Sequence, residues 1–321
     1  MCIYLRKILE GSTATEKKFE RKNLLWSRIY YYRIFLLMLI PVVLYYLVFS
    51  YAPMCGLVVA FREFSYKNLF GVGWVGLKHF KHIFEDDAFI KAIYNTIIIS
   101  FGRVIFEFPV PVILALLMNE IRNSRHKRIF QTIYTFPHFI SWVVVGGIIY
   151  KLFAGSGLVN QIIAATGGER VGFLTDGGSF LTLVFSSNIV KEAGWSTIIY
   201  LATIAGINPE MYESAIVDGA KRFAVVRFIT WPSIMPVAVL LLVLSIGNTM
   251  SAGFEQIFNM YNPSVYNVSD IIDTAIYRRT FKDGLNFSYS TAFGMFKSVV
   301  NMILLFAANA VAKKMGENSI F

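Results

Sequence analysis

Long apolar runs alternate with short polar stretches along this 321-residue chain. A helix of about 20 apolar residues is long enough to cross the hydrocarbon core of a bilayer. Runs of this kind occur at about 34–51, 90–118, 129–153, 180–205, 233–249 and 288–312. The pattern therefore predicts an all-α polytopic membrane protein with six transmembrane helices.

Prolines and charges within these runs predict local irregularities. Pro41 should kink the first span, and Pro109 with Pro111 should break the second. In the fourth run, the charges of Lys191 and Glu192 should divide an interfacial approach from a true span that begins near Gly194.

Three longer polar stretches should lie outside the bilayer on the outer side. Residues 52–89 are rich in turn-forming residues, and we expect short amphipathic helices there that lie on the membrane surface. Residues 154–178 form a Gly-rich loop with one basic residue. Residues 250–286 form an excursion whose length favours a functional role.

Basic residues set the orientation of the chain. They gather in the N-terminal tail and in the short loops after the second and fourth spans, which should therefore face the cytoplasm. The first apolar run is long and lacks a small-residue cleavage pattern at its end, so we expect an uncleaved span rather than a signal peptide. The expected organisation is a cytoplasmic tail at 1–33, a six-span domain at 34–312 and a second cytoplasmic tail at 313–321.

The composition is that of a membrane protein surrounded by lipid. Hydrophobic residues make up 56% of the chain, charged residues 16%, and the mean hydropathy is +0.57. The net charge of +10 is spread over tails and short loops, so it indicates membrane orientation and no nucleic-acid partner. Cys2 and Cys55 flank the first span and should face opposite sides, which argues against a disulfide.

Two charged residues within the second span invite opposite interpretations. Arg103 and Glu107 are four residues apart, so they share a helical face and can pair inside the membrane. The pair either belongs to a translocation path or clamps neighbouring helices together. We favour the clamp, because neither residue specifies a substrate group. His138 has no acidic neighbour in sequence, so we expect packing or hydrogen bonding rather than proton relay.

Two other patterns indicate chance resemblance rather than sites. Residues 71–76 fit GxGxxG, but no buried strand precedes them and no βαβ unit could form there. His79 and His82 have a ligand-like interval, yet no further cluster of metal-binding residues supports them. We expect interfacial packing for both histidines, and no metal site.

The most polar interruption of the C-terminal half is the segment 208–232. Asn208 is a good N-cap, and Pro209 fits the first helical position that follows it. Glu213 lies near the start of this helix, where negative charge suits the helix dipole, and Gly219 permits the turn that ends it. A helix this short cannot build a core alone, so it should dock into another element.

This segment resembles the EAA loop of ABC-importer permeases, whose pattern is EAA, x3, G, x9, I, x, LP. Here the pattern reads Glu213-Ser214-Ala215, then Gly219, Ile229 and Trp231-Pro232, with departures at the second and the penultimate motif positions. The resemblance implies that the segment is a coupling helix that inserts into a cytoplasmic ATPase. The coupling positions that it implies are Tyr212, Glu213, Ser214, Ala215, Asp218, Gly219 and Ala220.

Further strings extend the resemblance to the subfamily that imports sugars and oligosaccharides, the LplB-like polysaccharide permeases. They include FPVPVILALLMNEIR, QTIYTFPHFISWVVV and SDIIDTAIYRR. The resemblance implies a MetI-like permease fold in a bacterial cell membrane, with both termini cytoplasmic. It also implies a heterodimer with a second permease, a cytoplasmic ATPase dimer and an extracytoplasmic sugar-binding protein.

The resemblance implies a transport subunit rather than an enzyme. No GxxxxGK[ST] motif occurs, so this chain should bind no cofactor, and ATP and Mg should be used by the partner ATPase. Glu255, Gln256 and Tyr261 in the last outer excursion could contact sugar or the binding protein, or simply fold the loop. The alternative is an ion-gradient-driven secondary transporter, for which only Glu107 is a suitable intramembrane acid. A membrane-embedded enzyme lacks any supporting motif.

Overall fold

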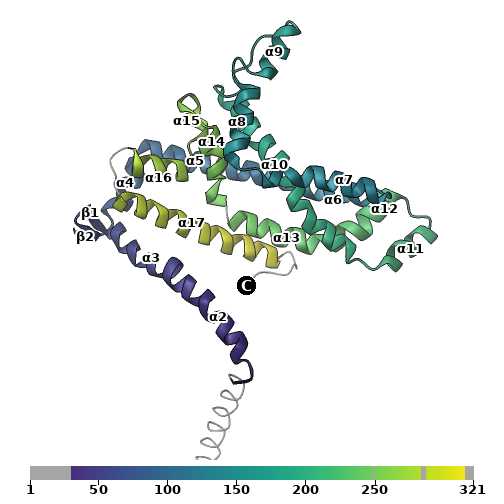
Figure 1. The fold of residues 1–321 in the computed structure, drawn as a ribbon, viewed down its shortest axis with the longest axis horizontal. Helices are drawn as coiled ribbons and strands as arrows, with labels where there is room; N and C mark the ends of the chain where they lie inside the picture. Colours follow the sequence, from purple (N-terminus) through teal and green to yellow (C-terminus); the bar gives the residue numbers. More distant parts are fainter. Residues whose placement is uncertain (1–29, 248, 283–286, 315–321) are drawn as a thin grey trace, which may run out of the picture. The chain divides into compact units, whose positions relative to one another are not determined.

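The computed structural model describes residues 30–247, 249–282 and 287–314 (Figure 1). Nearly all of the predicted tails, at 1–33 and 313–321, therefore lies outside the described residues. The chain divides after Val58 into two units. Five stretches of the described chain are long and apolar enough to cross a membrane: Arg33–Phe61, Asp87–Asn119, Trp142–Ala165, Arg222–Gly247 and Phe287–Lys314.

The first unit contains the expected first span. It consists of α2 (Arg33–Tyr46), a π-helical segment η1 (Leu47–Tyr51), the short α3 (Ala52–Met54) and the start of a 3₁₀ helix, η2 (Cys55–Phe61). None of the residues of α2, η1 and α3 is buried within the chain. An apolar helix without buried residues suits lipid or another membrane helix.

The second unit opens with an antiparallel hairpin, which corrects the expectation of helices alone at 52–89. β1 (Arg62–Ser65) pairs with β2 (Asn68–Trp74), and the amphipathic α4 (Lys78–Glu85) follows. Gly71 has a φ of +71°, and a Cβ there would lie 2.7 Å from the Glu63 carbonyl oxygen, so this glycine serves the hairpin. The Lys78 ammonium donates to the Glu63 carboxylate and holds its pKa below the usual range.

A helical bundle forms the centre of the second unit. The second span comprises α5 (Asp87–Gly102), a π-helical segment η3 (Arg103–Glu107) and α6 (Pro109–Asn119). α10 (Gly177–Ala205) packs along α6 and also against α13 (Trp231–Gly247), which packs against α17 (Phe287–Lys314). The apolar core that joins α6, α10 and α13 consists of Val112, Ala115, Tyr200, Ile204, Ile234 and Ala238.

Each π-helical segment among the described residues ends two residues before a proline. η1 precedes Pro53, η3 precedes Pro109, and η5 (Val226–Thr230) precedes Pro232. Proline lacks an N–H and its ring crowds the carbonyl four residues earlier, so the preceding turn cannot keep regular α-helical bonds. The wider turn restores a bond, as between the Phe108 N–H and the Arg103 carbonyl at 3.1 Å. The predicted disturbance of the second span thus takes the form of a π turn.

The expected third span, about 129–153, is not one helix. α7 (Ser124–Thr135) and the 3₁₀ turn η4 (Phe136–Phe139) are followed by a break at Ile140 and Ser141, after which α8 (Trp142–Phe153) begins. Figure 1 shows that α8 leaves the direction of α7. The break coincides with Pro137 and with an N-cap, where the Ser141 hydroxyl accepts from the Val144 N–H.

The expected division of the fourth run produces no break in the helix. α10 continues without interruption through Lys191, Glu192 and Gly194 for 29 residues, about 43 Å at 1.5 Å per residue. It is therefore long enough to span the bilayer. Its two charges do not end it because they are satisfied from the break between α7 and α8, as described below.

The expected outer excursions contain further helices. α9 (Leu158–Ala165) lies within the Gly-rich stretch 154–178. Residues after 248 form η6 (Thr249–Ser251), α14 (Phe254–Met260), η7 (Pro263–Val265), α15 (Tyr266–Ser269) and α16 (Ile272–Phe281). Ion pairs fix α16 to its surroundings: Arg279 with Asp86, Arg278 with Asp270, and Lys297 with Asp273.

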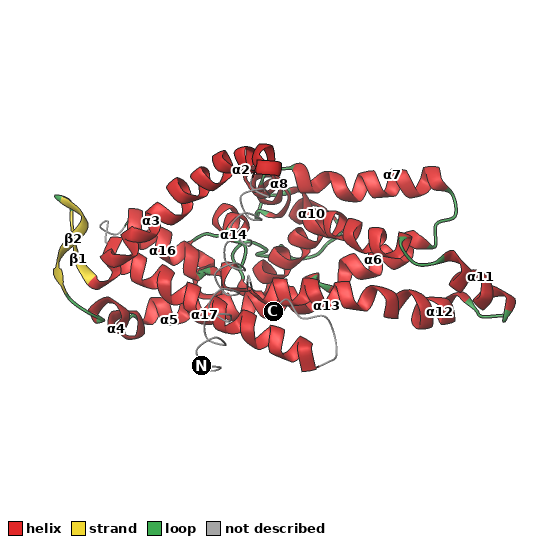
Figure 2. Cartoon of the chain, turned by 90° about the horizontal axis from the view of Figure 1, so that it is seen from below, coloured by secondary structure: helices red, strands yellow, loops and turns green. Residues whose placement is uncertain are grey.

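The segment predicted as a loop at 208–232 is shorter than expected. α11 (Pro209–Val217) is followed by a turn at 218–221, and α12 (Arg222–Val225) already begins the helix that continues through η5 into α13. The fifth span therefore starts about ten residues before Ser233. Figure 2 shows α11 beyond the ends of α6, α7 and α12, at one end of the second unit.

Candidate functional site

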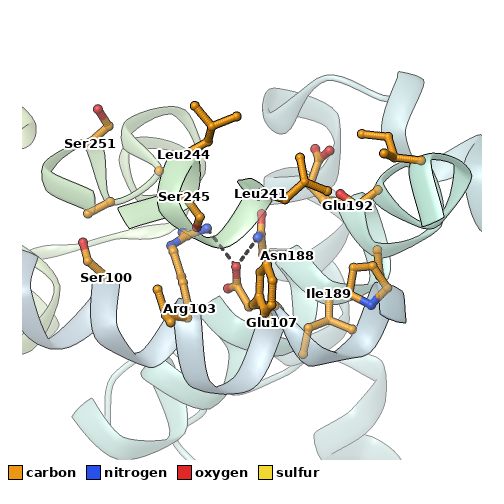
Figure 3. Close-up of a pocket in the computed structure, with 18 of the residues that line it drawn as sticks. Ser100, Arg103, Glu107, Asn188, Ile189, Glu192, Leu241, Leu244, Ser245 and Ser251 are labelled. Carbon is orange, nitrogen blue, oxygen red and sulfur yellow. Dashed lines mark hydrogen bonds and ion pairs between the residues drawn. The ribbon is translucent and has the colours of Figure 1, made fainter. Parts of the chain in front are cut away.

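A cavity with several polar side chains in a largely apolar lining, named the polar cavity here, lies inside the bundle of the second unit. It has a volume of about 410 Å³ and is enclosed by the second span, by α10 and by the end of α13 with the connection to α14 (Figure 3). Its polar lining residues include Ser100, Arg103, Glu107, Asn188, Glu192, Ser196, Ser245 and Ser251. Side chains from three separate parts of the sequence thus converge on one intramembrane space.

The ion pair expected from the sequence is present at this cavity. Arg103 Nη1 lies 3.4 Å from Glu107 Oε2, and Asn188 Nδ2 donates to the same oxygen (Figure 3). Arg103 Nη2 donates to Gln256 Oε1, whose own amide donates to the Val184 carbonyl at 2.6 Å. The pair therefore joins the second span to α10 and to α14.

Two atoms of this pair have no hydrogen-bond partner among the described residues. They are Arg103 Nε, a donor, and Glu107 Oε1, an acceptor, and both are buried. An unpaired buried polar atom costs about 1–3 kcal/mol. Such groups are rare in folded proteins, so this ion pair is incompletely satisfied within the described residues.

The backbone beside Arg103 is shaped to receive its guanidinium. Gly253 has a φ of +74°, and a Cβ there would lie 2.4 Å from Arg103 Nη2. The preceding residue, Ala252, also has a positive φ, of 39°, which is uncommon for a residue with a side chain. The turn between η6 and α14 is thus strained where it forms the cavity wall.

A second polar cluster occupies the break between α7 and α8. Lys191 Nζ donates to the His138 carbonyl at 2.7 Å and to Glu192 Oε1 at 2.9 Å. His138 Nδ1 lies 2.6 Å from Glu192 Oε2, and its ring stacks on Trp195 with centroids 4.5 Å apart. The acidic neighbour that His138 lacks in sequence is supplied by α10. The hydrogen-bonding role expected for His138 is therefore confirmed.

The predicted coupling positions lie together on and beside α11. The Asn208 side chain accepts from the Glu210 N–H at 3.1 Å, which confirms the N-cap, and Gly219 has a φ of +75°. No residue of α11 is buried, and Glu213, Ser214, Asp218 and Gly219 are exposed while Ala215 and Ala220 are half-buried. Tyr212 is tied to the start of the fifth span through a 3.1 Å hydrogen bond to Thr230.

The three residues suggested for sugar or docking contact are not brought together. Glu255 is exposed in the first turn of α14, whereas Gln256 is 1% exposed and holds Arg103. Tyr261 packs against Tyr266, with ring centroids 5.0 Å apart, and burial raises its pKa to about 12. Gln256 thus positions the ion pair at the cavity rather than lining it.

Sequence reasoning missed Asn188 and the role of Glu192 at the cavity. Asn188 lies three residues before Lys191 on the fourth run, so it is the polar residue one helical turn away on nearly the same face. A search for polar residues at helical spacing within the apolar runs could have found it.

The matched family model is described as a binding-protein-dependent transport system inner membrane component, and it covers residues 107–317. The polygalacturonan/rhamnogalacturonan transport system permease protein YteP of Bacillus subtilis (strain 168) is 42% identical over 307 residues, which are 95% of each chain. Protein LplB of the same organism is 42% identical over 287 residues, covering 89% of this chain and 90% of LplB.

Solved structures agree with these relatives. The crystal structure of a bacterial ABC transporter involved in the import of the acidic polysaccharide alginate contains a similar chain, with a TM-score of 0.83 and 39% identity. The match covers 90% of this chain and 98% of that chain. A second structure shows the bacterial alginate ABC transporter in complex with an alginate pentasaccharide-bound periplasmic protein, with a TM-score of 0.84 and 38% identity over 92% of this chain and 99% of that one.

Proposed function

Because the chain belongs to the family of binding-protein-dependent transport system inner membrane components, we propose that it is the permease subunit of an ATP-driven oligosaccharide importer. It is a transport subunit rather than an enzyme. The observation that carries the proposal is α11, a capped helix without buried residues whose sequence resembles the EAA loop. An ion-driven secondary transporter has no use for such a helix.

The exposed side of α11 suits docking into a partner. Ile216 and Val217 are exposed to 68% and 86% and flank Glu213 around the helix, while Met211, 46% exposed, lies on the other side. An exposed apolar patch beside a carboxylate fits a cleft that offers apolar contacts and a basic residue. We propose that this cleft belongs to a cytoplasmic ATPase, which binds the ATP and Mg.

The other proposed partners are a second permease subunit and an extracytoplasmic sugar-binding protein. The alginate transporter that resembles this chain was solved with a sugar-loaded periplasmic protein, which supports a delivering partner. Basic residues in the loop after α6 and around α12 favour a cytoplasmic position for α11 and for both termini, in a bacterial inner membrane.

We propose that the polar cavity lies on the substrate path. A sugar hydroxyl donates one hydrogen bond and accepts others, so it can pair with both Glu107 Oε1 and Arg103 Nε. Both atoms are buried in this structure, and the two side chains would have to turn toward the cavity to meet a ligand. The ion pair would then clamp the helices in one state and contact the substrate in another.

Relatives support an oligosaccharide as the cargo. Their names refer to polygalacturonan, rhamnogalacturonan and alginate, all of them polysaccharides. A cavity of about 410 Å³ holds about one or two sugar rings at a time, so a longer chain would have to pass through it in sequence.

The test is uptake of labelled oligosaccharide and ATPase activity in proteoliposomes that contain this chain with its second permease and ATPase. Glu213→Ala and Gly219→Val should each abolish most uptake while the protein still inserts. Matched controls lie outside α11: Glu169 is another exposed carboxylate, and Gly167 has a φ of +82° with open space where a Cβ would lie. Glu169→Ala and Gly167→Val should leave uptake near the wild-type rate. Uptake that needs no ATPase and ignores all four changes would contradict the proposal.

A further inference from the structure

A row of aromatic side chains connects the hairpin of the second unit with the wall of the polar cavity. The rings belong to the hairpin, to the start of α17, to α16 and to α14. Each ring centroid lies 4.8–6.4 Å from the next one in the order Tyr66, Phe64, Phe287, Phe281, Tyr277, Phe258 and Phe254. These separations are those of aromatic rings in contact. We call these residues the aromatic row.

The aromatic row follows one face of each helix that carries it. On α14, Phe254 and Phe258 are four residues apart, and so are Tyr277 and Phe281 on α16, so each pair shares a helical face. The core is filled by other residues of these helices: Gln256, Ile257 and Met260 on α14, and Ile272, Thr274, Ala275 and Thr280 on α16. In both views α16 lies between the hairpin and α14 (Figures 1 and 2).

The rings of the row are accessible from outside the chain. No member of the row is buried, and Tyr66, Phe281 and Phe287 are exposed to 75%, 60% and 37%. Neighbouring rings meet at 46° or more, except Phe254 and Phe258, which meet at 28°. The rings therefore do not cover one another's faces as a regular stack would. A contiguous exposed apolar surface of this kind is typical of a binding site.

One end of the row reaches the polar cavity. Phe254 directly follows Gly253, which lines the cavity together with Ala252. The other end, Tyr66, lies in the turn between β1 and β2. This turn and the segment 250–286 are predicted from the sequence to lie on the outer side of the membrane. The row thus connects the predicted outer surface with the cavity.

Polar groups beside the rings favour a saccharide over a hydrocarbon chain as the occupant. A sugar ring presents C–H groups on its faces, which pack on aromatic rings, and hydroxyls around its edge. Glu255 is exposed beside Phe254, and Asp273 lies one helical turn before Tyr277, where Lys297 Nζ donates to it at 2.7 Å. Sugar hydroxyls can donate hydrogen bonds to these carboxylates, whereas an acyl chain cannot.

We infer that the aromatic row is a saccharide-binding surface along which an oligosaccharide reaches the polar cavity. The inference rests on the proposed function, which supplies the sugar cargo and the cavity on its path. Several weak contacts in series suit transport, because binding must be favourable enough for the cargo to enter and weak enough for it to leave.

The test is uptake of two probes, the disaccharide and the hexasaccharide of galacturonic acid, by the complete importer in proteoliposomes. Phe281→Leu keeps an apolar side chain but removes a ring from the middle of the row. The KM for the hexasaccharide should rise about two- to tenfold. The KM for the disaccharide should rise less, because a shorter chain contacts fewer rings. Phe281→Tyr retains a ring and should keep both values near those of the wild type.

Phe70 provides the matched control. It lies on β2 outside the row and is 50% exposed, so Phe70→Leu changes an exposed phenylalanine of the same hairpin that carries Tyr66. Both KM values should stay unchanged. An unchanged KM for the hexasaccharide in Phe281→Leu, or an equal rise in Phe70→Leu, would overturn the inference.

Docking of the sugar-binding protein on the row would give a different pattern. Weaker docking would raise the KM for both sugars alike, and the immobilised importer would retain less of the purified binding protein. An equal rise for both sugars together with weaker retention would therefore assign the row to protein docking and contradict a saccharide surface.

Protection from labelling gives a measurement that needs neither transport nor the binding protein. In a Cys2→Ser, Cys55→Ser background, Phe281→Cys and Phe70→Cys are labelled with a maleimide in the assembled importer. The hexasaccharide should slow labelling of Phe281→Cys several-fold and leave labelling of Phe70→Cys unchanged. Equal protection at both positions, or protection at neither, would count against the inference.

The two proposals fail in different ways. If the wild-type importer accumulates the hexasaccharide but Phe281→Leu and Phe281→Cys behave like their Phe70 controls, only the assignment of the aromatic row is lost. If the wild-type importer accumulates neither probe, the proposed cargo is wrong and this inference fails with it.

Discussion

The backbones of α7 and α10 meet at Gly194. A Cβ at this position would lie 2.0 Å from the Tyr134 carbonyl oxygen, a distance that only movement of the backbone can relieve. Gly194→Ala should therefore destabilise the protein by about 1–3 kcal/mol or more. The measurement is thermal unfolding of the purified complex in detergent.

Gly147 provides the matched control for this prediction. It also lies within a membrane helix, α8, but nothing approaches a Cβ there within 4 Å. Because alanine favours helix, Gly147→Ala should be neutral or stabilise by up to about 1 kcal/mol. Equal destabilisation by both changes would show that the close approach at Gly194 does not matter.

The Arg103–Glu107 pair can be tested for its two roles separately. Arg103→Met leaves the Glu107 carboxylate buried without its counter-charge, which should cost about 3–5 kcal/mol of stability. Arg103→Met with Glu107→Gln removes both charges and should regain most of that loss. Unfolding measurements on the single and double variants test whether the ion pair stabilises the packing of the helices.

Transport by the same double variant tests whether the ion pair contacts the substrate. If the pair contacts the sugar, the stable double variant should still show a KM for uptake raised about tenfold or more, because hydrogen bonds to charged groups are lost. A double variant with normal stability and a normal KM would leave the pair with a clamping role alone.

At the scale of elements, the N-cap of α11 should affect coupling to the ATPase without affecting the stability of the fold. Asn208→Ala removes the N-cap, which is worth about 1 kcal/mol to a helix of nine residues that is marginal by itself. Because α11 has no buried residue, the unfolding temperature of the chain should hardly change, while sugar-stimulated ATPase activity should fall. Asn208→Ser keeps a capping oxygen and should restore the activity. A lower unfolding temperature in Asn208→Ala would show that α11 supports the fold.

Elements dominated by local chemistry were predictable from the sequence. The cap, the turn at Gly219 and most of the apolar spans follow from spacing and composition alone. The break between α7 and α8 coincides with Pro137, which the sequence contains, whereas the unbroken course of α10 depends on partners from another span. Lys191 and Glu192 look unfavourable in a span when α10 is considered alone, yet they bind His138 at the break of a different span. The hydropathy of one segment cannot show that another segment supplies the hydrogen-bond partners of its charged residues.

The same limit applies to the cavity. The spacing of Arg103 and Glu107 predicts that they can pair, and they do. Their further partners Asn188 and Gln256 are 81 and 153 residues away from the groups that they bind, so only the fold reveals them. The hairpin was missed because its strands are short and their alternation is interrupted by glycines at positive φ.

At the scale of the whole molecule, the orientation of the chain can be tested with its own two cysteines. Cys55 is exposed and lies near the C-terminal end of the first candidate span, Arg33–Phe61, whereas Cys2 belongs to the basic N-terminal tail. In intact cells, a membrane-impermeant maleimide should label Cys55 in a Cys2→Ser variant. It should label Cys2 in a Cys55→Ser variant only after the membrane is permeabilised.

The reverse labelling pattern would also change the side of the membrane assigned to α11. With six spans, the loops after the second and fourth spans face the same side as the N-terminus, and α11 lies in the later of these loops. Labelling of Cys2 from outside would therefore place α11 on the outer surface, where no cytoplasmic ATPase could bind it. The labelling pattern thus tests both the direction of the chain in the membrane and the possibility of coupling through Glu213.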